Sequence, residues 1–198
     1  MTTKEKQLKQ VARDLKNKST CPLKATATQP VAGEGNADAD IFFIGEAPGR
    51  NEDEQGRPFI GAAGKVLEGL LNSIDLKRED VFITSIEKFR PPKNRDPKPV
   101  EVMACFPFLE KQIKIIEPKL IVTLGRHALR RMLEWEEGKE MKAPPSMEKL
   151  RGKIIEGKSG RRYYPIHHPA AVLYNPKLRE TLQNDFKKIS EILKRIKK

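Results

Sequence analysis

The alternation of short apolar runs with longer helical repeats constrains the fold of this chain more than any other feature. Apolar runs with strand character cover residues 40–44, 81–86, 119–124 and 162–167. Between them, apolar residues three and four positions apart indicate helices over about residues 62–74, 99–116 and 126–135. Strands that alternate with helices favour a parallel sheet with right-handed crossovers. The pattern therefore predicts an α/β fold, a three-layer α/β/α sandwich around a central, mostly parallel four-stranded sheet.

The remaining segments complete a single expected domain over residues 1–198. Thr2 and Glu5 have the spacing of a capping box, which predicts an N-terminal helix over residues 2–16. A basic amphipathic helix over residues 177–197 is expected to close the chain. Three further segments are expected between these elements: a loop over 17–38, a flexible insertion over 136–150, and a hairpin that pairs 153–157 with 162–167.

Composition bounds the possible partners and the compartment. The formal net charge of +12 is compatible with a polyanionic partner such as a nucleic acid, or with the lysine-rich solvated surface of a heat-stable protein. No apolar run reaches membrane-spanning length, and the charged N-terminus lacks a signal-peptide core. Two cysteines, Cys21 and Cys105, do not make a disulfide framework. We therefore expect an intracellular, cytoplasmic protein with no membrane partner; the family resemblance described below adds the expectation of a prokaryotic origin and association with the nucleoid.

The segment Ile41–Gly61 carries the first candidate site. An apolar strand runs into a turn that contains Gly45, Pro48 and Gly49, at the sheet edge where α/β folds place their ligands. Four carboxylates follow or flank this turn: Glu46, Glu52, Asp53 and Glu54. Carboxylates repel phosphate, so this turn is not a phosphate cradle. They suit the activation of water or the stabilisation of a developing cation.

An aromatic residue in this segment has two interpretations. Phe59 follows Pro58 in a Gly- and Pro-rich loop. It is either part of the core, the usual environment of a phenylalanine, or a surface on which a planar ring stacks.

Two later segments are candidates for the same edge of the sheet. His167 and His168 end an alternating strand, and side chains alternate along a strand, so one of the two points toward the acidic turn. His168, next to Pro169, is the better candidate to donate a hydrogen bond to a developing anion. The spacing does not match a metal site, and none is predicted. A basic loop contains Arg90, Lys93, Asn94 and Arg95, which are expected either to contact phosphates or to form a stiff solvated loop.

Five segments, in this order, resemble the family 4 uracil-DNA glycosylases of the uracil-DNA glycosylase superfamily. They are GEGNADADIFFIGEAPG, EDEQGRPFIG, ITSIEKFRPPKNRDP, IVTLG and HHPAAVLYNP, between Cys21 and Pro176. The resemblance implies a monofunctional enzyme that flips uracil out of DNA and cleaves its N-glycosidic bond, leaving an abasic site. The implied partner is DNA that contains uracil or another deaminated base, and the protein is expected to be a monomer.

The resemblance also implies roles for individual residues. Phe59 stacks on the flipped base, and His168 hydrogen-bonds the pyrimidine O2 as negative charge builds there. Glu46 is the first candidate to activate water or stabilise an oxocarbenium-like sugar. Glu52 and Asp53 are second candidates or shape the loop. The remaining implied contacts are pocket-lining backbone at Ala47 and Gly49, a minor-groove wedge at Val172 or Leu173, and phosphate contacts from the basic loop.

Two departures from the family pattern affect cofactor and specificity. Family 4 members hold a 4Fe-4S cluster with four cysteines, but here only Cys21 and Cys105 occupy those positions, with Lys24 and Phe89 at the other two. Lysine and phenylalanine do not replace thiolates, so no cluster and no other cofactor is predicted; Phe89 is expected to pack where the cluster would lie, and the two cysteines to be free buried thiols. Ser85 stands where the family has the asparagine that pairs with the uracil edge, a change expected to cost about 1–3 kcal/mol of discrimination.

Three functions are therefore open from the sequence. The first is a glycosylase that acts on deaminated bases in DNA. The second is a DNA-damage binder without catalysis, or a glycosylase with altered specificity for hypoxanthine, xanthine or abasic sites, because Ser85 and the lost cysteines mark a changed site. The third, an enzyme of free nucleotides or nucleosides, fits the pocket but not the basic charge.

Overall fold

The computed structural model describes residues 1–196, and at its centre is one six-stranded sheet with the order β1-β3-β2-β4-β6-β5. The strands are β1 (Glu34–Gly35), β2 (Ile41–Gly45), β3 (Phe82–Ser85), β4 (Leu120–Leu124), β5 (Ile155–Glu156) and β6 (Arg162–Ile166). The four longer strands pair in parallel, which confirms the predicted parallel four-stranded centre. The two-residue strands β1 and β5 add an antiparallel edge on each side.

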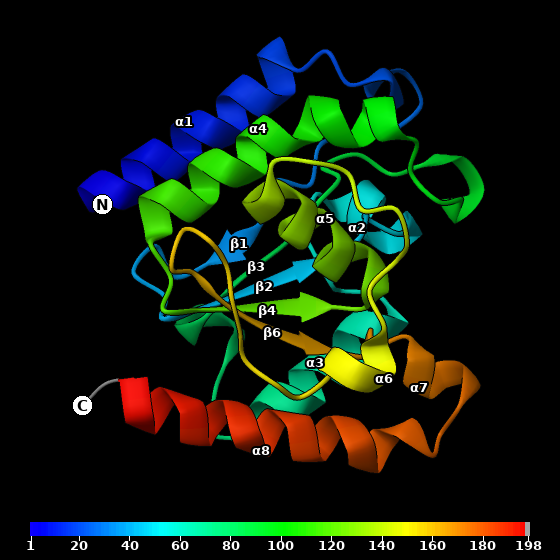
Figure 1. Ribbon diagram of the computed structural model, residues 1–198. Helices are drawn as coiled ribbons and strands as arrows, with labels where there is room; N and C mark the ends of the chain where they lie inside the picture. The colour runs from blue at the N-terminus through cyan, green and yellow to red at the C-terminus, as the bar shows by residue number, and fades with distance from the viewer. Residues whose placement is uncertain (197–198) are drawn as a thin grey trace.

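Helices cover both faces of the sheet, which gives the predicted three layers (Figure 1). The α-helices are α1 (Thr3–Lys18), α2 (Arg50–Gln55), α3 (Ala62–Asn72), α4 (Pro99–Ile116), α5 (Arg126–Glu137), α6 (Met147–Leu150), α7 (Ala171–Tyr174) and α8 (Leu178–Ile196). Short 3-10 turns are η1 (Pro22–Ala25), η2 (Arg78–Asp80) and η3 (Pro92–Asn94). Helices α1, α4 and α5 lie on one face, and α3 and α8 lie on the other (Figure 1). No helix within residues 1–196 is long and apolar enough to cross a membrane.

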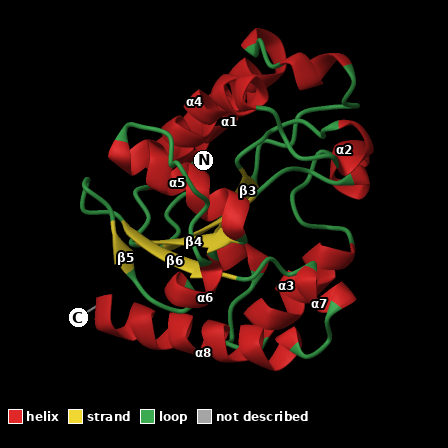
Figure 2. Cartoon of the chain, turned by 45° about the vertical axis from the view of Figure 1, so that its right-hand side comes forward, coloured by secondary structure: helices red, strands yellow, loops and turns green. Residues whose placement is uncertain are grey.

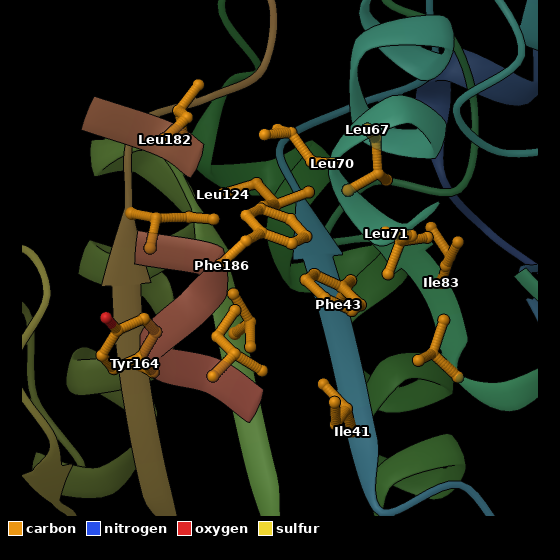
Figure 3. Close-up of a cluster of buried hydrophobic side chains, with 14 of the residues drawn as sticks. Ile41, Phe43, Leu67, Leu70, Leu71, Ile83, Leu124, Tyr164, Leu182 and Phe186 are labelled. Atoms are coloured by element: carbon orange, nitrogen blue, oxygen red, sulfur yellow. The ribbon is translucent and has the colours of Figure 1, made fainter. Parts of the chain in front are cut away.

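The face toward α3 and α8 holds the larger part of the core. Phe43 of β2 stacks on Phe186 of α8 with ring centroids 5.8 Å apart, and Leu67 and Leu71 of α3 pack beside them (Figure 3). These side chains are fully buried. Because α8 presents its apolar stripe to the sheet, its lysines and arginines remain toward solvent, as the amphipathic pattern predicts.

Strand periodicity explains the opposite face. Phe42 and Ile44 of β2 alternate with Phe43 and point toward α4 and α5, where they meet Ile113 and Met132. Both faces of the parallel strands are therefore buried, which accounts for their continuous apolar sequence.

Two segments expected to be irregular are more ordered than predicted. The loop over 17–38 contains η1 and the edge strand β1. The segment over 136–150 includes the end of α5 and helix α6, and the Glu134 carboxylate accepts a hydrogen bond from the Met141 backbone at 3.0 Å. The hairpin of β5 and β6 is confirmed, and so is the Thr2–Glu5 capping box. The predicted final helical residue, at position 197, lies outside the described residues.

The carboxyl ends of the parallel strands meet at one edge of the sheet. Figure 1 shows the arrowheads of β2, β4 and β6 pointing toward the side where α2, α3 and α7 lie, and Figure 2 shows the same edge from another side. Gly45, Ser85, Leu124 and Ile166 end the four parallel strands. Strand order reverses at β2, since β3 lies on one side of it and β4 on the other, and α/β sheets bind ligands at such a point.

Candidate functional site at the carboxyl edge

A pocket of about 470 Å³ opens at this edge of the sheet. It is lined by residues from the β2 turn, the Phe59 loop, the end of β3, the basic loop and the β6 turn. The predicted residues that line it are Glu46, Ala47, Gly49, Glu52, Phe59, Ser85, Asn94, Arg95 and His168. Segments far apart in sequence thus converge as their positions at strand ends predict.

Glu46 follows β2 and is half-buried in the pocket wall. Burial raises the pKa of its carboxyl, His127 and Arg126 oppose this rise, and Asp96 adds to it. The Nδ1 atom of His127 lies 4.0 Å from the Glu46 carboxylate, so the two form an ion pair when His127 is protonated. Glu46 can therefore present an anion next to a bound ligand.

Phe59 is held in a strained backbone conformation. Its φ of 50° lies in the left-handed region, which costs a residue other than glycine about 1–2 kcal/mol. The guanidinium of Arg78 donates to the carbonyls of Phe59 at 2.9 Å and Pro58 at 2.6 Å, while Glu34 binds the same guanidinium. The ring lies over Gly45, where an added Cβ would come 2.4 Å from the ring. Glycine at position 45 thus lets the Phe59 ring lie against the end of β2.

Glu52 shapes the loop rather than facing the ligand with a free carboxylate. Its Oε1 accepts hydrogen bonds from the backbone of Ile60 at 2.9 Å and Gly61 at 2.7 Å. This carboxylate joins α2 to the start of α3 and fixes the loop that carries Phe59. Of the two roles expected for Glu52, the geometry favours loop shaping.

Asp53 does not line the pocket, contrary to its expected place beside the base. It is buried, and its two carboxylate oxygens accept hydrogen bonds from the backbone N–H of Thr28 at 2.9 Å and the Thr28 hydroxyl at 2.8 Å. Residues 50–55 form helix α2, so adjacent side chains point in different directions and Glu52 and Asp53 separate.

His168 presents one defined nitrogen to the pocket. The backbone N–H of Ala170 donates to its Nδ1 at 3.1 Å, so Nδ1 carries no proton in this arrangement. Burial lowers the pKa of His168 to about 4, with Glu52 opposing the shift. The neutral imidazole therefore has its proton on Nε2 and can act as a hydrogen-bond donor. Its ring lies 5.6 Å from that of Phe59, tilted by 31°.

Ser85 ends β3 and lines the pocket from a buried position. Its Oγ lies beside Gly45 and Phe59, 3.4 Å from where a Cβ at Gly45 would stand. A hydroxyl at this depth can donate one hydrogen bond and accept others, but it is shorter than the amide of asparagine.

The basic loop at the rim contributes fewer free cations than expected. Asn94 and Arg95 line the pocket, but the Arg95 guanidinium is paired with the Glu101 carboxylate. Arg90 donates to the side chain of Asn94 at 2.8 Å, and Lys93 is exposed. Arg90 and Lys93 lie outside the pocket lining, which leaves them to contact a larger ligand around the mouth.

Helix α7 begins directly after the pocket residue Ala170 and contains both candidate wedge residues, which differ in their burial. Val172 is 3% exposed and packs into the core, so it does not project from the surface as a wedge would. Leu173 is 49% exposed, and Tyr174 is 89% exposed. Of the two expected residues, only Leu173 can reach a ligand, and Tyr174 is an additional candidate.

Sequence reasoning missed residues that follow β4. The turn Gly125-Arg126-His127 stands at the same sheet edge as the other turns, so its position was a usable signal. Glu46, Asp96 and His127 can each offer a metal-ligand atom, and these atoms lie within 4.8 Å of one another. The cluster is partly exposed, and within it the Nδ1 atom of His127 lies 4.0 Å from the Glu46 carboxylate.

The four positions of the expected iron–sulfur site do not fit a four-thiolate cluster. Cys21 and Cys105 are buried with Leu15, Leu23 and Phe89 in a small apolar cluster between α1 and α4. The Cys21 thiol donates to the Glu101 carbonyl at 3.8 Å, and the Cys105 sulfur accepts from the Lys88 backbone N–H at 3.4 Å. The interaction of the two neighbouring thiols lowers the pKa of Cys21 to about 7 and raises that of Cys105. Lys24, at the second of the four positions, is exposed. An aromatic ring and an ammonium group supply no thiolate, so the chain has two of the four ligands.

Comparison with known proteins identifies the family of the chain. The family model of the uracil DNA glycosylase superfamily matches residues 32–195. A type-4 uracil-DNA glycosylase of Sulfurisphaera tokodaii is 46% identical over 189 residues, which cover 93% of this chain and 84% of the relative. Those of Archaeoglobus fulgidus and Thermotoga maritima are 45% and 41% identical, over 93% and 98% of this chain and 92% and 99% of theirs. The chain belongs to the uracil DNA glycosylase superfamily, and its similarity to the type-4 members extends over nearly its whole length.

Proposed function

We propose that this protein is a DNA repair glycosylase that removes uracil from DNA by hydrolysing its N-glycosidic bond and leaves an abasic site. The observation that carries the proposal is the convergence of Glu46, Phe59 and His168 on one pocket, in a chain similar to type-4 uracil-DNA glycosylases. A base inside a duplex is out of reach of such a pocket, so the nucleotide must flip out of the helix, at a cost of a few kcal/mol.

Phe59 and His168 bind the flipped base in this mechanism. The Phe59 ring stacks on the pyrimidine, and the strained loop held by Arg78 fixes the ring before the base arrives. As the glycosidic bond breaks, negative charge develops on the base and reaches its O2. The Nε2–H of neutral His168 donates a hydrogen bond to that oxygen, and a donor oriented in advance stabilises the transition state more than the ground state.

Glu46 acts on the sugar side of the broken bond. Its carboxylate stabilises the oxocarbenium-like sugar and accepts a proton from the attacking water. Because burial raises its pKa, the anion is lost as pH falls through a value above that of an ordinary glutamate. Base release is therefore expected to decline on the acid side.

DNA contacts lie outside the pocket. Arg90 and Lys93 at the rim bind phosphates, so affinity falls as salt rises. Leu173 fills the space that the flipped base leaves in the stack. The proposal treats the protein as a monomer without an iron–sulfur cluster. A colourless preparation without iron supports the latter, and a brown one with four irons per chain contradicts it.

Ser85 favours a second candidate function, altered base specificity. A hydroxyl offers one short, rotatable oxygen where an amide offers a separate donor and acceptor at longer reach, so the pocket distinguishes uracil less sharply and can admit hypoxanthine or xanthine. If the changed site binds damaged DNA but releases no base, the protein is a DNA-damage binder without catalysis.

One panel of oligonucleotides separates these possibilities. Single-turnover base release is measured on duplex and single-stranded DNA with U·G, U·A, hypoxanthine, xanthine or no lesion. Uracil release that is lost in His168→Ala supports the proposal, while full activity in that variant removes His168 from the mechanism. Release of a different base moves the assignment to the second function. Tight binding to damaged DNA without release identifies the damage binder.

A further inference from the structure

A second glutamate, Glu87, lies next to Glu46. Glu87 is two residues beyond the end of β3 and is 1% exposed. Its backbone N–H donates to the Glu46 carbonyl at 3.0 Å, so the two chain segments continue side by side beyond the sheet. The position of Glu87 is thereby tied to that of Glu46 through the backbone.

The Glu87 carboxyl group is unusual for a buried polar group. Both of its oxygens are buried and accept no hydrogen bond from the described residues. Buried carboxyl groups are normally paired, because leaving one without a partner is costly. A role confined to filling space would be met better by an apolar side chain of the same size.

A small cavity connects the two glutamates. It measures about 20 Å³, enough for one water molecule, and its lining includes Glu46, Glu87, His127 and Arg131. A water at this place has the polar partners that a buried water needs. Glu46 lines both this cavity and the pocket at the sheet edge, whereas Phe59, Ser85 and His168 line only the pocket.

The surroundings keep Glu87 protonated at neutral pH. Burial raises its pKa to about 8; Glu46 adds to this shift, while Arg131 on α5 and Lys88 oppose it. Cys105 of α4 also faces this carboxyl group. A protonated carboxyl group has an O–H to donate, which an ionised one lacks.

We propose that Glu87 is a positioning residue for Glu46: its carboxyl O–H donates through one water molecule in this cavity to the Glu46 carboxylate. The hydrogen bond fixes the orientation of Glu46 and stabilises its anionic form. The inference rests on the proposed function, in which the Glu46 anion serves base release.

Two substitutions separate positioning from packing. Glu87→Gln keeps the size and an N–H donor and is neutral at every pH. Glu87→Leu keeps a similar volume but has no donor. Thr123→Val is the matched control, because the Thr123 hydroxyl on β4 is also buried without a hydrogen-bond partner among residues 1–196 but does not line the cavity.

Single-turnover uracil release is measured as a function of pH, together with DNA affinity and melting temperature. We expect about a tenfold slower release in Glu87→Leu, the effect of one lost water-mediated hydrogen bond, with DNA affinity unchanged. In Glu87→Leu, the decline of the release rate on the acid side moves to higher pH, because the Glu46 anion has lost a hydrogen-bond donor. Release by the wild type falls above about pH 8, where Glu87 ionises, and Glu87→Gln retains its rate there. Lys88 is present in every variant. If the fall in release rate above about pH 8 is absent in Glu87→Gln, that fall is therefore assigned to Glu87.

Other outcomes overturn the inference. Glu87→Leu with the rate and pH profile of the wild type, like Thr123→Val, means that Glu87 only fills space. Glu87→Gln as slow as Glu87→Leu means that a donor at this position is not what matters. A wild-type protein that releases no base refutes the proposed function and this inference with it, whereas an active wild type with unaffected Glu87 variants refutes the inference alone.

Discussion

The protonation of His168 makes the stability of this protein depend on pH in a way that can be calculated. The imidazole has an ordinary pKa of 6.5, and burial lowers this to about 4 in the folded chain. Protons therefore bind His168 more readily in the unfolded chain. The contribution of His168 to stability is complete above about pH 6.5 and is lost as pH falls toward about 4.

The two pKa values give the size of the effect. Between about pH 7.5 and about pH 5, the difference in proton binding lowers the free energy of unfolding by about 2 kcal/mol. The structure gives the reason: protonation places a hydrogen on Nδ1, where the Ala170 N–H already points at 3.1 Å, so two donors face each other.

Urea unfolding of the wild type and His168→Gln at the two pH values measures this effect. The variant removes the titrating ring and keeps a polar side chain of similar size. His127 and His167 are present in both proteins, so their contributions cancel in the comparison. We expect the loss of stability on acidification to be about 2 kcal/mol smaller in His168→Gln. Equal losses in the two proteins would refute the assignment of a neutral, Nε2-protonated imidazole to this pocket.

Four further substitutions test the site and the core. Glu52→Ala removes the carboxylate that binds two backbone N–H groups of the Phe59 loop, so single-turnover release should fall at least tenfold, a loss of about 1.4 kcal/mol, and a wild-type rate would contradict loop shaping. Ser85→Asn restores the longer amide and should increase the preference for uracil over hypoxanthine by about 1–3 kcal/mol, measured as a ratio of release rates. Leu173→Ala should weaken binding to uracil-containing duplex but leave single-strand binding intact; equal loss on both would contradict a wedge. Phe186→Ala should lower the free energy of unfolding by about 3–5 kcal/mol in urea titrations while the rate per folded molecule stays the same.

The strands and long helices were predictable because their signal is local. The run Ile41–Gly45 is apolar at every position because both faces of β2 are covered, and the repeat in α8 has one apolar stripe. Strand β5 is two residues long but was predicted, because it forms one arm of the hairpin with β6. Strand β1 had no such signal. It is two residues long and exists because a neighbouring strand offers backbone partners, as when Glu34 and Gly35 meet Ile83 and Phe82.

The site was predictable by position more than by side-chain direction. Strand ends identified Glu46 and His168 as members of one pocket, since parallel strands share a carboxyl edge, and the family resemblance added Ser85. The roles of Glu52 and Asp53 could not be distinguished from the sequence. Their side chains point in different directions because they lie on α2, a six-residue helix that the acidic sequence did not predict. Glu87 was missed for a related reason: a charged residue just beyond an apolar strand usually faces solvent, and only the packing of α4 and α5 buries it.

The distribution of charge over the molecule explains how an acidic pocket can act on a polyanion. The chain carries a net charge of +12, yet Glu46, Glu52 and Asp96 line the pocket. In the proposed mechanism, phosphates are attracted to the basic surface and repelled by these carboxylates, so the DNA backbone stays at the rim while an uncharged base enters. In that mechanism the base meets the hydrogen-bond donor of neutral His168 on one side, and the sugar, where positive charge develops, lies toward the carboxylate of Glu46. A positive His168 would bind the departing base more tightly but would also cancel the field of Glu46. The low pKa of His168 therefore belongs to the same electrostatic arrangement as the anionic Glu46.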